Sequence, residues 1–266
     1  MKTKLALPLL VVTFILVSLA CQTSGPLGGL FATATPTPTN TSTPTPTATP
    51  SPTFTPSPTP LPTGVQSESL TDGSTKVIDY DYEYALLLSE DWLPIPANAE
   101  DIKKAVDAAS ENNPELEETL KNVDAILKDD TLRLLAYNTN RDYRDGTNYP
   151  NLIVVTLEDA VIKSLPLDFL LELNVEQIKE SSLNAEVTDS GVKTNKNKVE
   201  YGYIVIENSV NQDNKNVTVR QYSIIFKRDA AMTIFTLTIP GKVKDKADII
   251  LQDLLDSLYW LEDLPN

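Results

Sequence analysis

Hydrophobic side chains follow three different patterns along this chain of 266 residues. Almost every residue from Leu5 to Leu19 is apolar, whereas the stretch from Pro26 to Pro62 shows no apolar periodicity. Regular alternation of apolar and polar residues begins only after Ser74. The pattern therefore predicts three parts: a leader at residues 1–20, a linker at residues 21–75 and a globular domain at residues 76–266.

The domain opens with a pattern of period two. Asp79, Asp81 and Glu83 alternate with apolar positions, which predicts one half-buried strand with these apolar residues on its inner face: Ile78, Tyr80, Tyr82, Tyr84, Leu86 and Leu88. Trp92, Pro94 and Pro96 are expected to end that strand. Further strands are predicted at Leu132 to Tyr137, Leu152 to Leu157, Ala185 to Lys193, Val199 to Glu207, Val217 to Lys227 and Met232 to Ile239.

Helical spacing of apolar residues separates and follows these strands. It predicts a helical pair at Glu100 to Lys128, a helix that begins near Pro166 and a C-terminal helix from Ala247 to Leu258. Long runs of strands with helices at both ends are typical of an α+β fold. We therefore expect an antiparallel β-sheet covered by helices.

The N-terminal segment has the parts of a secretory signal peptide. Lys2 and Lys4 precede the apolar run, and the small residue Ala20 precedes Cys21. The run Val17-Ser18-Leu19-Ala20-Cys21 resembles a bacterial lipobox. That resemblance implies cleavage after Ala20 and lipidation of Cys21, and hence a lipid-anchored protein on the extracytoplasmic face of the cell membrane. An uncleaved membrane helix and soluble secretion are the alternatives.

The linker is rich in proline and threonine. The stretch from Pro26 to Pro62 holds 11 of the 19 prolines. Alternate prolines favour an extended polyproline-II chain of about 3.1 Å per residue, without a packed core. We expect a disordered stalk that reaches on the order of 100 Å. A Pro-rich ligand or an O-glycosylated stalk is the alternative.

Charge and missing residue types exclude several functions. No charged residue lies between Lys4 and Glu68. The chain from Glu68 onward therefore holds 22 − 2 = 20 basic and 37 acidic residues, which is a net charge of −17. Such a charge disfavours nucleic acid and anionic lipid surfaces as partners. The chain has no histidine, and Cys21 is its single cysteine. We therefore expect no enzyme, no catalytic residue, no metal site and no cofactor.

A loop between two predicted strands carries the candidate binding residues. Arginine and tyrosine are enriched in recognition surfaces, and the loop Asn138 to Tyr149 contains four such residues: Arg141, Tyr143, Arg144 and Tyr149. Trp92 is a further candidate. A solvated connection between strands is the alternative for the loop. For Asp79, Asp81 and Glu83 we expect a solvated strand face, with part of a cation site as the alternative.

Two segments resemble a known family. The run Tyr84-Ala85-Leu86-Leu87-Leu88-Ser89-Glu90-Asp91-Trp92 resembles the opening of PsbP/Mog1-like domains, which include bacterial lipoproteins of the DcrB and LpqN type. The closing strand Thr233 to Ile239 and the helical run Leu254-Leu255-Asp256-Ser257-Leu258 resemble that family's ending. The resemblance implies an α-β-α sandwich that binds an envelope protein or a small ligand as an accessory module. A carboxylate-dependent envelope hydrolase and a purely structural surface lipoprotein are the alternatives.

Overall fold

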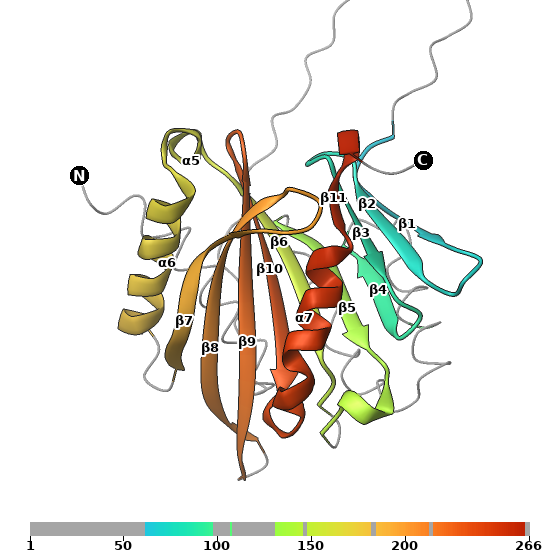
Figure 1. Ribbon diagram of the computed structural model, residues 1–266, viewed down its shortest axis with the longest axis vertical. Helices are drawn as coiled ribbons and strands as arrows, with labels where there is room; N and C mark the ends of the chain where they lie inside the picture. The colour runs from blue at the N-terminus through green and yellow to red at the C-terminus, as the bar shows by residue number, and fades with distance from the viewer. Residues whose placement is uncertain are drawn as a thin grey trace, which may run out of the picture. The chain divides into compact units, whose positions relative to one another are not determined.

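The computed structural model describes residues 62–97, 107, 131–145, 148–181, 185–212 and 215–263. The predicted leader and the predicted stalk up to Leu61 lie outside the described residues, as does the predicted helical pair apart from Asp107. Within the described part, the strands form one seven-stranded and one four-stranded antiparallel sheet (Figure 1). None of the helices in these ranges has the length and the apolar character needed to cross a membrane.

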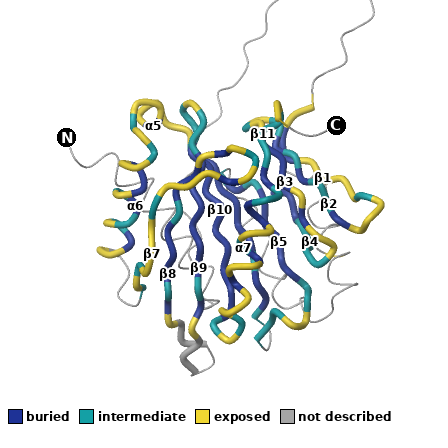
Figure 2. Tube along the Cα trace, viewed as in Figure 1, coloured by how far each residue is buried: buried dark blue, intermediate teal, exposed yellow. Residues whose placement is uncertain are grey.

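The seven-stranded sheet forms the centre of the domain. Its strands are β4 (Trp92–Pro96), β5 (Leu132–Asn138), β6 (Asn151–Glu158), β10 (Ala231–Pro240), β9 (Lys215–Arg228), β8 (Glu200–Gln212) and β7 (Ala185–Thr194), in that spatial order. Every neighbouring pair is antiparallel. Six of these strands were predicted from their alternation, and β7 to β10 pair in sequence order as a meander. Figure 2 shows the central strands buried and β7 largely exposed at the sheet edge.

Helices cover both faces of this sheet. Helix α6 (Leu167–Ser181), preceded by the short α5 (Ala160–Ser164), packs Leu170, Leu171 and Ile178 with Ile204 and Ile225 of the sheet. Helix α7 (Ala247–Asp256), preceded by the 3-10 segment η3 (Gly241–Lys246), covers the opposite face (Figure 1). The predicted α+β sandwich is therefore confirmed.

The four-stranded sheet packs on the α7 side. Its order is β1 (Val65–Ser69), β2 (Thr75–Asp79), β3 (Tyr84–Leu88) and β11 (Leu258–Trp260), followed by η4 (Leu261–Asp263). The strand β1 lies inside residues 21–75, the range predicted as linker. The last three-residue strand falls where the sequence predicted the end of a helix, so α7 ends earlier, at Asp256.

The single strand predicted from Ile78 to Leu88 is wrong, because the chain reverses direction between β2 and β3. The Oδ1 atom of Asp79 accepts hydrogen bonds from the backbone N–H groups of Asp81 and Tyr82, and Glu83 has the left-handed φ of 57°. These contacts close a turn whose sequence still alternates with period two. Trp92 to Pro96 also differ from the prediction, since they form the edge strand β4, where proline is tolerated.

Candidate binding groove

An open groove of about 420 Å³ runs beside helix α7. We call it the α7 groove. The residues of its α7 side are Ile250, Asp253, Leu254, Asp256 and Ser257. The other lining residues come from the β1–β2 loop, from β3 to the start of β4, from β5 with η2, from the β7–β8 turn and from β11. They are Asp72, Ser74, Leu87, Leu88, Ser89, Asp91, Trp92, Asn138, Tyr143, Lys196 and Tyr259. The volume of the groove lies within the range of ligand sites, and its walls carry more charged groups than such sites usually do.

Local hydrogen bonds hold the aromatic residues of the groove in place. The N–H of Trp92 donates to Ser89 O at 2.9 Å and closes a turn between β3 and β4. The Asp91 carbonyl accepts from the N–H of Thr139 at 2.7 Å, and the Asp91 carboxylate accepts from Asn140 Nδ2 at 3.0 Å. The β3–β4 connection is therefore tied to the segment that follows β5.

The 3-10 turn η2 (Arg141–Tyr143) places Tyr143 at the groove. Asn140 caps this turn, because its side-chain oxygen accepts from the N–H of Asp142 at 3.0 Å. The Nζ atom of Lys246 lies 4.9 Å from the centre of the Tyr143 ring. A cation from the chain itself therefore already rests against one aromatic wall of the groove.

The structure separates the predicted binding residues into two groups. Trp92 and Tyr143 line the α7 groove, whereas Arg141, Arg144 and Tyr149 do not. Tyr149 is only 4% exposed and belongs to the core under α6. Its hydroxyl accepts from Arg144 Nη1 at 2.8 Å, so Tyr149 is an internal residue of the loop, whereas Arg144 is half-buried and Arg141 is exposed.

Negative charge dominates the α7 groove. Asp72, Asp91, Asp253 and Asp256 line it together with one lysine, and the Nζ atom of Lys196 lies 3.4 Å from Asp256 Oδ2. Hydrogen bonds from the Ser74 hydroxyl and N–H lower the pKa of Asp72, so this carboxylate is charged at neutral pH. Sequence reasoning missed Asp253 and Asp256. The available signal was their placement on the polar side of an amphipathic helix.

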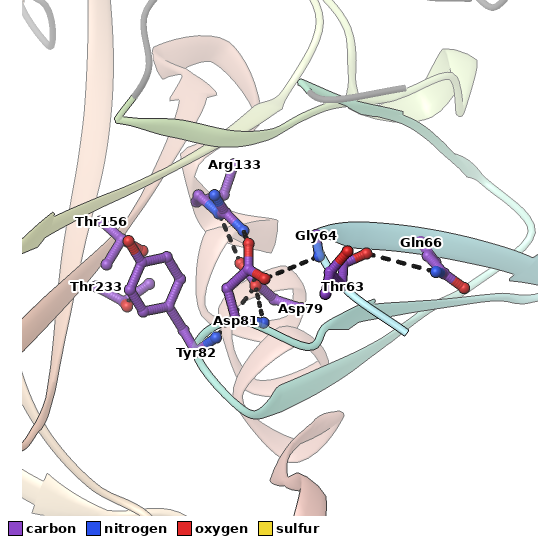
Figure 3. A network of polar contacts seen from close by, with 9 residues as sticks. All are labelled: Thr63, Gly64, Gln66, Asp79, Asp81, Tyr82, Arg133, Thr156 and Thr233. Atoms are coloured by element: carbon purple, nitrogen blue, oxygen red, sulfur yellow. Dashed lines mark hydrogen bonds and ion pairs between the residues drawn. The ribbon is translucent and has the colours of Figure 1, made fainter. Parts of the chain in front are cut away.

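The predicted acidic strand face is wrong for Asp79, which is fully buried, whereas Asp81 and Glu83 are exposed but lie in a turn and not on a strand. Figure 3 shows the polar contacts of Asp79 and Asp81. Arg133 on β5 binds Asp79 with Nε–Oδ2 at 2.8 Å and Nη2–Oδ1 at 2.9 Å, and it reaches Asp81 Oδ2 at 2.6 Å. The same guanidinium lies 4.8 Å from the centre of the Tyr82 ring. The buried Asp79 and the exposed Asp81 therefore share one guanidinium, and no cluster of potential metal ligands exists among the described residues.

The three tyrosines expected in the core differ in burial. Tyr84 is only 2% exposed and packs edge-on against Phe235, with ring centres 5.4 Å apart. Burial, together with the charge of Asp79, raises the pKa of Tyr84 well above its usual value. Tyr80 and Tyr82 are only half-buried, because they lie in the turn after β2 and not on a strand.

A second, smaller hollow of about 200 Å³ lies near the turn between β2 and β3. In this hollow, the guanidinium of Arg228 binds Glu83 Oε2 at 2.7 Å and lies 5.1 Å from the centre of the Trp260 ring. The arginine of this hollow is therefore already paired with a carboxylate.

Three comparisons with known proteins gave matches among solved structures alone. No protein-family model matches the chain, and no curated protein matches its sequence. Among solved structures, the chain is similar to cyanobacterial PsbP of Synechocystis sp. PCC 6803, with 11% identity over 74% of this chain and 92% of that chain and a TM-score of 0.43.

Two further solved structures are similar to this chain. The Ran-binding protein Mog1p of Saccharomyces cerevisiae is 14% identical over 71% of this chain and 95% of that chain, with a TM-score of 0.39. LpqN of Mycobacterium tuberculosis, involved in cell envelope biogenesis, is 11% identical over 47% of this chain and 70% of that chain, with a TM-score of 0.34. The names of these structures include PsbP, Mog1 and LpqN, the proteins that the predicted PsbP/Mog1-like resemblance concerns.

Proposed function

We propose that this domain is a binding or accessory module that recognises an envelope protein or a small ligand through the α7 groove. The observation that supports this most is the meeting of Trp92 and Tyr143, from β4 and η2, on one open groove. Aromatic side chains offer a large contact area at a small cost in conformational entropy, which suits them to recognition.

The second part of the proposal is attachment to the membrane through Cys21. The lipobox-like sequence and the long Pro/Thr-rich linker support it, because two or more acyl chains anchor a protein durably and the linker would hold the domain away from the bilayer. Replacement of Cys21 by serine should release the protein from the membrane fraction and from the detergent phase. Unchanged retention of Cys21→Ser would refute the lipid anchor.

We infer that the module works without catalysis. A carboxylate-dependent hydrolase needs an acid whose pKa is raised toward neutrality. Hydrogen bonds lower the pKa of Asp72 and of Asp81. These two carboxylates are therefore charged at neutral pH, which suits binding better than proton transfer.

Site-specific crosslinking in intact cells tests the recognition surface. Leu87 is 40% exposed and lines the groove, so a photoreactive phenylalanine analogue at this position should crosslink to the bound partner. The crosslink should disappear when Trp92→Ala and Tyr143→Ala are introduced together. Phe169, an exposed apolar residue on α6, is the matched control position.

The two outcomes are distinct. A product that forms at Leu87, depends on Trp92 and Tyr143 and is absent at Phe169 supports the groove as the binding surface. Equal products at Leu87 and Phe169, or a Leu87 product unaffected by the double variant, would overturn the assignment. Thermal unfolding of each purified variant shows whether the domain is still folded.

A further inference from the structure

The charge in the α7 groove is one-sided. Asp72, Asp91, Asp253 and Asp256 face a single ammonium group, that of Lys196, which already lies 3.4 Å from Asp256. The rest of the chain strengthens this imbalance, since residues 5–266 carry a net charge of 20 − 37 = −17. A cationic partner is therefore attracted at long range and meets a groove whose four carboxylates outnumber its one lining lysine.

The apolar part of the groove suits the stems of long basic side chains. Leu87 is 40% exposed in the groove, which is also lined by the largely buried Ile250 and Leu254 of α7. Lysine and arginine bury their methylene groups on such surfaces while their charged ends stay near carboxylates.

The aromatic residues add a second mode of cation recognition. Trp92, Tyr143 and Tyr259 line the groove, and aromatic rings attract ammonium and guanidinium groups. The chain itself shows the geometry, because Lys246 Nζ lies 4.9 Å from the centre of the Tyr143 ring. Elsewhere in the domain, Arg228 stands in the same way over Trp260, at 5.1 Å.

We propose that the ligand of the α7 groove is a short extended peptide segment of a partner protein that carries at least two lysine or arginine residues. This inference rests on the proposed function of the groove. Carboxylates lie on both the α7 wall and the facing wall of the groove, so they can pair with several positive charges along one peptide. An anionic polymer or a phosphate-bearing ligand would meet repulsion from the same groups.

Binding of defined peptides to the full-length protein in detergent tests this ligand class. An eight-residue fluorescent peptide in which four Lys or Arg alternate with Gly or Ala should bind at least about tenfold more tightly than the same peptide with Gln at those four positions. Its affinity should fall as salt is raised from 50 to about 300 mM, because the contact is electrostatic. A neutral hexasaccharide serves as the competing probe.

Charge-neutralising variants locate the binding to the groove. Asp253→Asn with Asp256→Asn should weaken the basic peptide about tenfold, since two exposed ion pairs are lost. Glu172→Gln with Glu176→Gln, on the exposed side of α6, removes the same charge from the other face and should leave the affinity unchanged. Equal melting temperatures of the two double variants show that folding is not the cause.

Three results would overturn the inference: equal affinity for the basic and the Gln peptide, tighter binding of the hexasaccharide, or equal loss in both double variants. The proposed function fails separately. If the Leu87 crosslink is groove-dependent but basic peptides do not bind, the groove is a binding surface for another ligand class. If the crosslink is not groove-dependent, both the groove assignment and the inferred ligand class are wrong.

Discussion

At the scale of single residues, Arg133 and Asp79 form a charge pair inside the domain. Asp79 is fully buried and receives hydrogen bonds from Arg133 Nε and Nη2 and from two backbone N–H groups of the following turn. A buried carboxylate that loses its cation keeps the cost of desolvation without compensation. This pair therefore ties the β2–β3 turn of the small sheet to β5 of the large sheet.

Removal of the cation alone should be more harmful than removal of both charges. Arg133→Met should lower the free energy of unfolding by about 3–5 kcal/mol, because Asp79 stays buried and unpaired. Adding Asp79→Asn should recover part of that loss, since the amide oxygen still accepts from the turn. Urea unfolding of both single variants and the double variant measures this coupling. Strictly additive losses would show that the two groups do not interact.

Tyr137 on β5 should make the domain sensitive to alkali. Burial raises the pKa of Tyr137 to about 12, so the folded state holds the phenol neutral while the unfolded chain ionises near its ordinary value of 10.0. The stability gained from the neutral form is complete below pH 10 and is lost between pH 10 and 12, at about 1.4 kcal/mol per pH unit.

Tyr137→Phe is the matched variant, since it keeps the ring and removes the ionisation. Its free energy of unfolding should fall less steeply than that of the wild type between pH 10 and 12. Urea unfolding in a pH series measures the difference in slope. Parallel curves for the two proteins would contradict the assigned cause.

At the scale of elements, the β7–β8 turn holds the end of α7 and the start of β11. Asn195 is buried, and its Nδ2 donates to the carbonyls of Leu255 at 2.8 Å and Leu258 at 3.2 Å. Asn197 Nδ2 donates to the same Leu258 carbonyl at 2.8 Å and to that of Asp256 at 3.1 Å. Helix-end carbonyls that would lack partners are satisfied in this way.

Asn195→Ala should lower the free energy of unfolding by about 2–3 kcal/mol. Two carbonyl acceptors lose a buried donor, and the N–H groups of Asn197 and Val199 lose the Oδ1 acceptor. Ser190→Ala on the exposed strand β7 is the control and should change stability by less than about 0.5 kcal/mol. Thermal and urea unfolding measure both. A loss in Asn195→Ala no larger than in the control would mean that the turn is not needed to hold the helix end.

The elements with long periodic patterns were predictable from the sequence. Strands β8 to β10 and helix α6 carry apolar residues at a constant spacing over many positions, so burial of one face determines the structure. Three features were not predicted from the sequence. The β2–β3 turn preserves period two, β1 buries only Val65 among polar neighbours, and Leu258 continues the helical pattern of α7 although it belongs to β11.

The candidate groove was predictable only in part. Trp92 and Tyr143 stood out as residue types suited to recognition, and both reach the groove. Tyr149 is also an aromatic residue of the loop, but it packs into the core. A loop sequence does not show on which side of a sheet an aromatic ring lies, so this could not be predicted. Asp253 and Asp256 become groove residues only because the β3–β4 connection happens to lie opposite their helix.

At the scale of the whole molecule, the domain begins earlier than the sequence pattern indicated. The strand β1 pairs with β2 over five residues, and the N–H of Gly64 donates to Asp81 Oδ1 at 2.9 Å. That hydrogen bond also lowers the pKa of Asp81, which reaches Arg133. The junction with the linker is thus connected to the ion-pair network between the two sheets.

A chain that begins at Thr63 should be more stable than one that begins at Lys76. The shorter chain lacks the pairing of β1, the buried side chain of Val65 and the Gly64 hydrogen bond, for an expected loss of about 2–4 kcal/mol. Urea unfolding of the two purified chains measures the difference. Equal unfolding midpoints would show that residues 63–75 add no stability to the domain.

The four-stranded sheet joins the start of the domain to its last strand, since β3 lies between β2 and β11. Ribosomes make the chain from the N-terminus, so β3 keeps one unpaired edge until residue 260 has been synthesised. Until then the backbone N–H and C=O groups along that edge have no partner strand, so the small sheet is complete only when both ends of the domain have been made.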